Sequence, residues 1–297
     1  MVRAVFVYHV APVLGLGVDW RKYQSTWTVI TGCTDGIGKA YLFALASKGL
    51  RKFILISRNS AKLKDTADIL KELHSDCQVE TYAFTFGQDS YDKLKKFLLQ
   101  FEIMILVNNV GDAPSMLQRF GDDYETDKRV CLVNTEPAFE LIQTVLPIMK
   151  AARHGIIVNM SSSQSIRPVP LLTSYSASKV YIAYLSECLH HEYSPDGIIV
   201  QCLVPLLVST KLVYYTDDIP NMARHFVVTP ETFARQAVSS LGVVSYTMGC
   251  FNHEVQKSFL YLLPWWILRH LVAPIYKGQQ ARLLAIHQKT KEKSQNS

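Results

Sequence analysis

The sequence contains few charged residues and no closely spaced cysteine pair. Only 19% of its 297 residues are charged, and the net charge of +6 is spread along the chain apart from a basic tail at Lys289, Lys291 and Lys293. Without a concentrated basic patch, nucleic acid is not an expected partner. The six cysteines lie far apart and form no CxxC motif. We therefore expect reduced thiols facing the cytosol, without a disulfide, zinc or other metal site.

The sequence also lacks a long uninterrupted hydrophobic run. Residues 4–18 are apolar, but the stretch is short and contains His9 and Pro12, whereas a membrane-spanning helix needs about 20 apolar residues. Residues 1–24 are therefore at best a weak membrane anchor. A second apolar stretch, 259–276, carries two prolines and paired tryptophans, which suit a membrane interface. Packing on the domain or in a homodimer is the alternative.

The composition that remains is globular and apolar. Hydrophobic residues make up 48% of the chain, and the mean hydropathy is +0.09. Such a chain can bury a large core and still present apolar surface to a lipid or a lipid-like ligand. We predict a single domain over residues 25–255, followed by an apolar, aromatic-rich segment with a basic tail over 256–297.

Apolar runs alternate with helical patterns along the chain. The expected strands are TWTVITG, KFILIS, VETYAFTF, IMILVNN, GIIVNMS and IIVQCLVP. The expected helices cover about 38–48, 61–74, 91–101, 127–152 and 174–193. This alternation predicts βαβ units, and runs that are apolar at every position predict strands covered on both faces. The predicted fold is α/β, a doubly wound parallel sheet of Rossmann type with its ligand at the carboxyl edge.

After Pro205 the pattern becomes looser, and we predict a lid or substrate wall. Thr229 and Pro230 are placed to begin the next helix as its N-cap and first residue. The apolar candidates for the wall are Leu206, Leu207, Val208, Val213 and Tyr214. Ordinary core packing is the alternative for them. Lys211 and Arg224 are candidates for binding the phosphates of a fatty acyl-CoA.

A glycine-rich turn, TGCTDGIG over residues 31–38, joins the first expected strand to the first helix. Glycines let the backbone approach a pyrophosphate, whose charge then meets the helix N-terminus. The candidate cofactor-binding residues here are Gly32, Thr34, Asp35, Gly36, Ile37 and Gly38. The alternative is a turn with a purely structural role. The position of the turn after the first strand of a βαβ series favours cofactor binding.

The second expected strand ends at Ser57 and Arg58, where an NAD site usually places an acidic side chain. A guanidinium can instead bind a 2′-phosphate through two charge-assisted hydrogen bonds. Ser57 and Arg58 therefore predict a preference for NADP(H). The alternative is that Arg58 is simply a solvated residue after a strand.

Four residues form a candidate catalytic group. Tyr175 and Lys179 are four apart in a helical pattern, so both project from one face. A free tyrosine ionises at about pH 10, and an adjacent ammonium stabilises its phenolate for acid or base work. Ser162, at the end of an expected strand, is placed to bind the substrate carbonyl. Asn134, in the preceding helix, is a candidate for holding a water that resupplies the proton.

These motifs resemble the short-chain dehydrogenase/reductase family over about residues 27–250. The likeness rests on the TGxxxGxG turn, the NNVG element at 108–111, and the YxxxK pair with its serine and asparagine. It implies a catalytic tetrad of Asn134, Ser162, Tyr175 and Lys179 in a single Rossmann-type domain that often forms dimers or tetramers. It also implies that Lys179 binds the nicotinamide ribose. Further cofactor-binding candidates are Asn109, Gly111, Tyr175, Lys179 and Pro205.

A narrower resemblance is to the branch that contains 17β-hydroxysteroid dehydrogenase types 3 and 12, the latter a very-long-chain 3-oxoacyl-CoA reductase. The segments that carry it are 27–40 (WTVITGCTDGIGKA), 55–59 (LISRN), 105–111 (ILVNNVG), 168–173 (PVPLLT), 208–212 (VSTKL) and 249–253 (GCFNH). The branch implies NADPH, reduction of a keto group on a lipid-like molecule, and a cytosol-facing place in the endoplasmic reticulum membrane.

Two departures from that branch affect the site. Thr85 stands where an acidic residue of the branch usually binds the adenine amino group, which predicts weaker cofactor binding. Residues 112–127 are richer in acidic side chains than the branch and could reshape the substrate entrance. The favoured function is NADPH-dependent reduction of a 3-oxoacyl-CoA or of a 17-keto or related steroid. The alternative is a catalytically silent protein that binds a lipid or a partner, and the alternative location is the cytoplasm.

Overall fold

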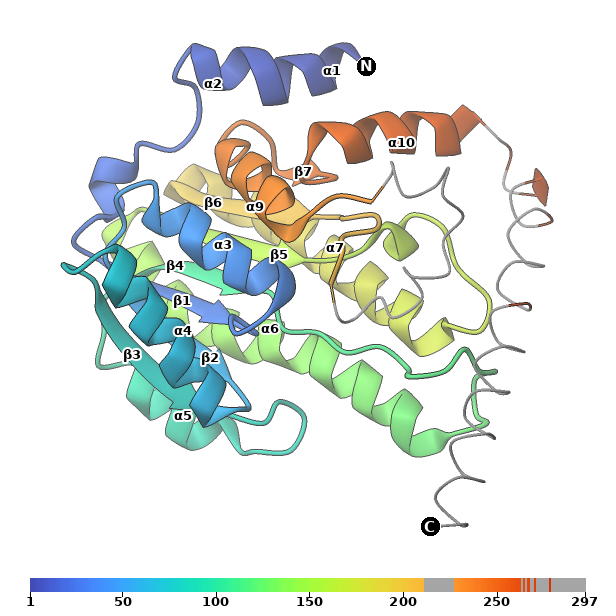
Figure 1. Cartoon of the computed structure of the whole chain (residues 1–297), viewed down its shortest axis with the longest axis horizontal. Helices are drawn as coiled ribbons and strands as arrows, with labels where there is room; N and C mark the ends of the chain where they lie inside the picture. Colours follow the sequence, from blue (N-terminus) through green and yellow to red (C-terminus); the bar gives the residue numbers. More distant parts are fainter. Residues whose placement is uncertain (211–226, 263, 265, 268–269, 271–277, 279–297) are drawn as a thin grey trace.

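The computed structural model describes residues 1–210, 227–262, 264, 266–267, 270 and 278 (Figure 1). The wall candidates Val213 and Tyr214, the phosphate candidates Lys211 and Arg224, and the basic tail lie outside the described residues.

A seven-stranded sheet forms the centre of the molecule (Figure 1). Its strands, in spatial order, are β3 (Gln78–Ala83), β2 (Lys52–Ser57), β1 (Trp27–Thr31), β4 (Ile103–Asn108), β5 (Gly155–Met160), β6 (Ile198–Leu203) and β7 (Tyr246–Thr247). Every neighbouring pair is parallel. The strand order reverses between β1 and β4, and such a reversal opens a crevice at the carboxyl edge of a sheet. The predicted doubly wound sheet of Rossmann type is confirmed.

Helices cover both faces of the sheet (Figure 1). On one face lie α3 (Gly36–Ala46), α4 (Ser60–Leu73) and α9 (Pro230–Ser239), and on the other α5 (Tyr91–Leu98), α6 (Tyr124–Ala152) and α7 (Thr173–Tyr193). Because both faces are covered, every residue of β4 and β5 is buried, as their continuous apolar runs predict. The predicted helices are confirmed, with ends that differ by at most three residues.

Side chains that accept hydrogen bonds from the first turn begin several helices. Asn59 begins α4, Ser90 begins α5, and Asp123 begins α6 through the main-chain N–H of Thr126. The predicted cap of α9 is confirmed, because the hydroxyl of Thr229 accepts from the N–H of Thr232 and Pro230 follows as the first helical residue. Such caps satisfy N–H groups that have no partner within the helix.

The third strand is shorter than predicted. β3 ends at Ala83, whereas the expected strand continues to Phe86. Phe84 and Phe86 are instead buried, and the Phe84 ring lies 5.0 Å from the rings of both Phe86 and Tyr91. These rings pack together where the chain leaves the sheet.

The first residues form a helical segment in three parts, which we call the N-terminal helix. It comprises α1 (Val2–Val5), the π-helical η1 (Phe6–Val10) and α2 (Ala11–Val13), and it lies beside α10 (Phe251–Leu262) in Figure 1. Arg3 donates to the carbonyl of Tyr246 at 2.7 Å, and the hydroxyls of Tyr8 and Thr247 share a buried hydrogen bond. In the described part of the chain, no helix has the length and apolar character needed to cross a membrane.

Candidate active site

A cleft of about 690 Å³ opens at the carboxyl edge of the sheet. Segments that follow six of the strands line it, including Gly32 after β1, Arg58 after β2, Asn109 after β4, Ser162 after β5 and Pro205 after β6. The fold therefore brings most of the expected cofactor and catalytic residues to one cleft, as the parallel sheet predicts. Thr34, Gly38 and Asn134 do not line it.

The glycine-rich turn occupies one side of this cleft. Gly32 and Gly36 have φ angles of +63° and +51°, which glycine adopts without strain. A Cβ atom added to Gly38 would lie 2.4 Å from the Gly32 carbonyl oxygen and 2.3 Å from Asn109 Nδ2, so only glycine fits there. Asp35, at the N-cap of α3, makes no side-chain capping bond. The start of α3 thus keeps N–H groups for an anion.

Asn109 fastens this turn to the end of β4. Its side-chain Nδ2 donates to the carbonyls of Thr31 and Gly32 at 3.0 and 3.1 Å. The main-chain N–H groups of Asn109 and Val110 both donate to the hydroxyl of Thr31 at 3.0 Å. The side chain of Asn109 is therefore committed to the shape of the turn, although the residue also lines the cleft.

The predicted phosphate-selecting residues lie at the next strand end. The hydroxyl of Ser57 lies 3.2 Å from that of Thr34, which braces the glycine-rich turn. Arg58 is exposed and lines the cleft, and no described residue forms an ion pair with it. Its guanidinium is thus available to an anion in the cleft.

Thr85 and Gln88, which follow β3, also line the cleft. The main-chain N–H of Thr85 donates to the carboxylate of Asp89 at 2.6 Å. The nearest acidic side chain in sequence is therefore used to shape the loop, while Gln88 presents an exposed amide at the cleft.

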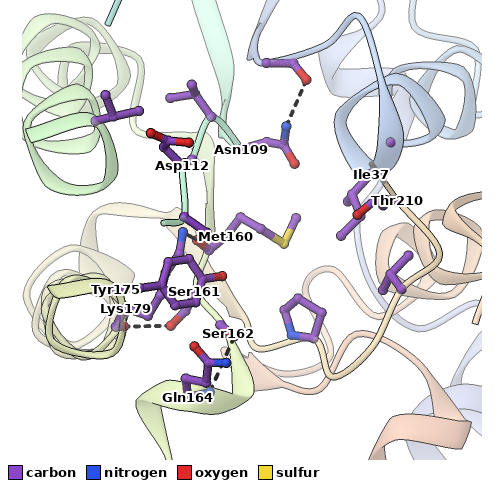
Figure 2. A pocket seen from close by; sticks show the side chains of 18 of the residues that line it. Ile37, Asn109, Asp112, Met160, Ser161, Ser162, Gln164, Tyr175, Lys179 and Thr210 are labelled. Atoms are coloured by element: carbon purple, nitrogen blue, oxygen red, sulfur yellow. Dashed lines mark hydrogen bonds between the residues drawn. The ribbon is translucent and has the colours of Figure 1, made fainter. Parts of the chain in front are cut away.

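Tyr175 and Lys179 project from α7 into the cleft, as Figure 2 shows. The ammonium of Lys179 lies 5.5 Å from the centre of the Tyr175 ring and donates to the carbonyl of Met160 at 3.2 Å. Tyr175 and Ser162 line the cleft together. Ile37 and Thr210 face this group from the other side of the cleft (Figure 2).

Burial governs the protonation of this pair. Lys179 is 4% exposed, and burial lowers its pKa to about 8 because the charged ammonium loses water. Burial raises the pKa of Tyr175 for the same reason, and the neighbouring Ser162 hydroxyl partly offsets this. Tyr175 is therefore a neutral hydroxyl near pH 7, beside a cation that can stabilise its phenolate.

Asn134 holds the loop after β4 beside Lys179. Its Oδ1 accepts from the N–H of Asp112 at 2.7 Å, and its Nδ2 donates to the Asp112 carbonyl at 2.9 Å and to the hydroxyl of Ser178 at 3.0 Å. Gly111 permits the close approach, since an added Cβ would lie 3.2 Å from Lys179 Nζ. Both amide hydrogens of Asn134 are used, and one lone pair of Oδ1 remains for a water.

Comparison with known proteins agrees with this geometry. Residues 26–218 match the family model described as short chain dehydrogenase. The chain belongs to the short-chain dehydrogenase family. It is 38% identical over 265 residues to a very-long-chain 3-oxoacyl-CoA reductase of Homo sapiens, a match that covers 87% of this chain and 82% of that protein. It is 37% identical over 266 residues to a hydroxysteroid dehydrogenase-like protein 1 of Gallus gallus, covering 87% and 78%.

A solved structure extends the likeness to three dimensions. A short-chain dehydrogenase from Sphingobium yanoikuyae in complex with NADPH superposes with a TM-score of 0.62 at 25% identity, covering 71% of this chain and 82% of that one. The predicted membership of the family and of its narrower branch is confirmed.

The cleft of this short-chain dehydrogenase fits a nicotinamide dinucleotide. Gly38 lets the glycine-rich turn pack directly against Asn109 and the Gly32 carbonyl. Gly32 and Gly36 of that turn line the cleft, and the start of α3 offers N–H groups to a pyrophosphate. Lys179 has three donors, of which described residues accept one. The protein is therefore an oxidoreductase of this family with a nicotinamide cofactor site.

Two acidic side chains of residues 112–127, the segment that departs from the branch, pair with other residues of the protein. Asp112 pairs with Arg129 at 2.7 Å. Asp127 is buried, accepts from the N–H of Gly121 at 2.9 Å, and binds the hydroxyl of Ser174. Because Ser174 precedes Tyr175, Asp127 braces the turn of α7 that presents the tyrosine. The sequence did not point to Asp127 in this role, since its partners lie 6 and 47 residues away.

Proposed function

We propose that this short-chain dehydrogenase uses NADPH to reduce a keto group on a lipid-like substrate to a secondary alcohol, with Tyr175 as general acid. The observation that carries the proposal is that Tyr175 and Ser162 line the cleft together beside the buried ammonium of Lys179, which lies 5.5 Å from the centre of the Tyr175 ring. The apolar side chains of Leu206 and Leu207 form the adjacent wall of the cleft.

The chain's own groups would polarise the carbonyl and supply the proton. The hydroxyls of Ser162 and Tyr175 donate to the carbonyl oxygen, which stabilises negative charge as it develops there. The nicotinamide ring, when bound, provides a hydride for the carbonyl carbon. Tyr175 then transfers its proton to the alkoxide oxygen, and the ammonium of Lys179 stabilises the resulting phenolate. Asn134 keeps the loop beside Lys179 in place and can hold a water that returns the proton.

The preferred substrate class is a 3-oxoacyl-CoA, and a 17-keto or related steroid is the second candidate. The first is supported by the name of the human relative, and the second by the hydroxysteroid dehydrogenase-like protein of Gallus gallus. An apolar wall suits either molecule. Selection of NADPH is supported by the exposed guanidinium of Arg58 in the cleft.

A substrate panel tests the proposal. NADPH oxidation is followed through the loss of the absorbance of the reduced nicotinamide, with 3-oxoacyl-CoAs of increasing chain length and a set of ketosteroids as substrates. We expect turnover with the 3-oxoacyl-CoAs and a kcat/KM that rises with chain length, because each added CH₂ buries more apolar surface. Tight NADPH binding without turnover of any ketone would instead support the catalytically silent alternative.

The pH dependence of reduction provides a second prediction. Since kcat/KM reports the ionisations of the free enzyme, it should fall as pH rises through about 8, where Lys179 loses its proton. Below that pH the ammonium is charged, and Tyr175, with its raised pKa, remains protonated throughout. Lys179→Arg should move this alkaline limb upward, because a guanidinium keeps its charge. A wild-type profile that stays flat to about pH 10 would contradict the role of Lys179.

We also propose that the N-terminal helix and α10 rest on a cytosol-facing membrane surface, that of the endoplasmic reticulum. Large apolar side chains of both helices are exposed to solvent: Val2, Phe6, Val13, Phe259 and Leu262. The two helices contact each other, and exposed apolar surface of neighbouring helices suits insertion into the lipid interface.

Vesicle flotation tests this docking. Val13 is 84% exposed, so Val13→Asp should not disturb packing. Burying a valine contributes at least about 1.5 kcal/mol, and its loss should lower the partition coefficient onto phosphatidylcholine vesicles about tenfold. The control is Leu73→Asp on α4, where Leu73 is 64% exposed. Equal binding by the Val13 variant and the wild type would show that this helix does not dock.

A further inference from the structure

His253 lies fully buried in the first turn of α10 and binds the backbone of the cleft wall. Its Nδ1 accepts from the main-chain N–H of Leu206 at 3.3 Å, and its Nε2 lies 3.2 Å from the carbonyl oxygen of Leu207. Since Nδ1 accepts, the proton is on Nε2, which donates to Leu207. One imidazole ring therefore binds the main chain on both sides of the Leu206–Leu207 pair.

The main-chain groups that His253 binds have few other hydrogen-bond partners. Among described residues, His253 is the acceptor for the N–H of Leu206. The carbonyl of Leu207 also accepts from the N–H of Val228 at 3.2 Å. Removing the imidazole would leave one main-chain N–H without a protein partner, and such groups favour rearrangement of the segment that carries them.

The ring itself is held in one orientation and one charge state. It packs 5.9 Å from the ring of Phe233 in α9, and Phe233 fits only because position 249 is glycine, where an added Cβ would lie 2.3 Å from the ring. Burial lowers the pKa of His253 to about 4, so the ring is neutral at physiological pH and Nδ1 remains an acceptor. The structure thus gives a role to Gly249 and His253, the first and last residues of the GCFNH segment.

The segment that His253 holds is hydrogen-bonded to the loop that carries Ser162. The carbonyl of Pro205 accepts from the N–H of Ser163 at 2.9 Å, one residue after Ser162. The side chains of Leu206 and Leu207 are half-buried and line the cleft. The wall is thus tied at one end to the loop of Ser162 and at the other to α10.

We propose that His253 is a positioning residue, which sets substrate affinity by fixing the Leu206–Leu207 wall of the cleft without touching the reacting atoms. The inference rests on the proposed function for its kinetic consequence, because the wall is assigned to the substrate there. Its structural part, that the imidazole holds this segment in place, stands independently of the reaction.

Kinetics of two variants test the consequence. His253→Leu removes both hydrogen bonds and should raise KM for the best ketone of the panel about tenfold while kcat changes less than about threefold, since Ser162 and Tyr175 are untouched. His253→Asn can still accept from Leu206 and should raise KM only about threefold. His191→Leu, on the exposed surface of α7, is the matched control and should behave as the wild type.

Amide hydrogen exchange tests the structural part without any substrate. Exchange at Leu206 should be faster in His253→Leu than in the wild type and should return toward the wild-type rate in His253→Asn. A folded His253→Leu variant with unchanged KM, or with unchanged exchange at Leu206, would overturn the proposal. If that variant does not fold, an unchanged KM in His253→Asn overturns it instead.

The failure of the proposed function has a different signature. A wild-type protein that turns over no ketone contradicts the reductase assignment, and exchange at Leu206 then still decides whether His253 holds the wall.

Discussion

Replacing Tyr175 by phenylalanine should lower kcat for ketone reduction by roughly 10³-fold, within the range for loss of a general acid. The variant keeps the ring beside Lys179 and loses only the hydroxyl that would protonate the alkoxide. Cofactor binding should persist, because the glycine-rich turn and Arg58 are unaffected. Steady-state reduction with NADPH measures the loss, and fluorescence titration measures the cofactor dissociation constant.

Tyr184→Phe is the matched control, since it makes the same change on the same helix at a side chain that is 68% exposed. It should retain wild-type activity. Loss of less than about tenfold in Tyr175→Phe would mean that another group or a water donates the proton. Such a result would remove Tyr175 from the mechanism and leave the cofactor site as it is.

Replacing Arg58 by alanine should lower kcat/KM for NADPH by roughly 10- to 100-fold, because hydrogen bonds to a charged group contribute about 1.5–3 kcal/mol. The value for NADH should hardly change, since NADH lacks the 2′-phosphate. The ratio of the two efficiencies therefore isolates the phosphate from every other contact. Steady-state rates with both cofactors and one substrate give this ratio.

Arg21→Ala serves as the control for loss of one positive charge. Arg21 is exposed and pairs only with Asp19 among the described residues, so its removal should leave the cofactor ratio unchanged. If Arg58→Ala reduced the efficiency with both cofactors equally, Arg58 would act on features that the cofactors share. The predicted selectivity for NADP(H) would then be wrong.

The sequence predicts much of the fold because the relevant signals are local. β4 is apolar at nearly every position and is buried at every one, which is the pattern of a strand covered by helices on both sides. The turn over residues 31–38 follows equally directly, since Gly38 tolerates no Cβ against Gly32. Spacing on one helix face also places Tyr175 and Lys179 together, whatever surrounds them.

Features that depend on residues far apart in the chain could not be predicted from local sequence patterns. β7 has two residues, too few for a periodic pattern, and exists because β6 offers an edge to pair with. Asn109 gives its side chain to the turn 77 and 78 residues earlier, a contact that requires β1 and β4 to be neighbours. His253 likewise finds Leu206 and Leu207 only when α10 has packed beside the sheet.

The attachment of the N-terminal helix has a consequence for biosynthesis. Its contacts from Arg3 and Tyr8 reach residues 243 and 239 positions later in the chain. At ribosomal rates of about 5–20 residues per second, these partners emerge roughly 12–50 seconds after the helix does. Throughout that interval the helix has neither β7 nor α10 to pack against. Its apolar side chains are therefore exposed and can bind chaperones, targeting factors or a nearby bilayer before the rest of the protein folds around them.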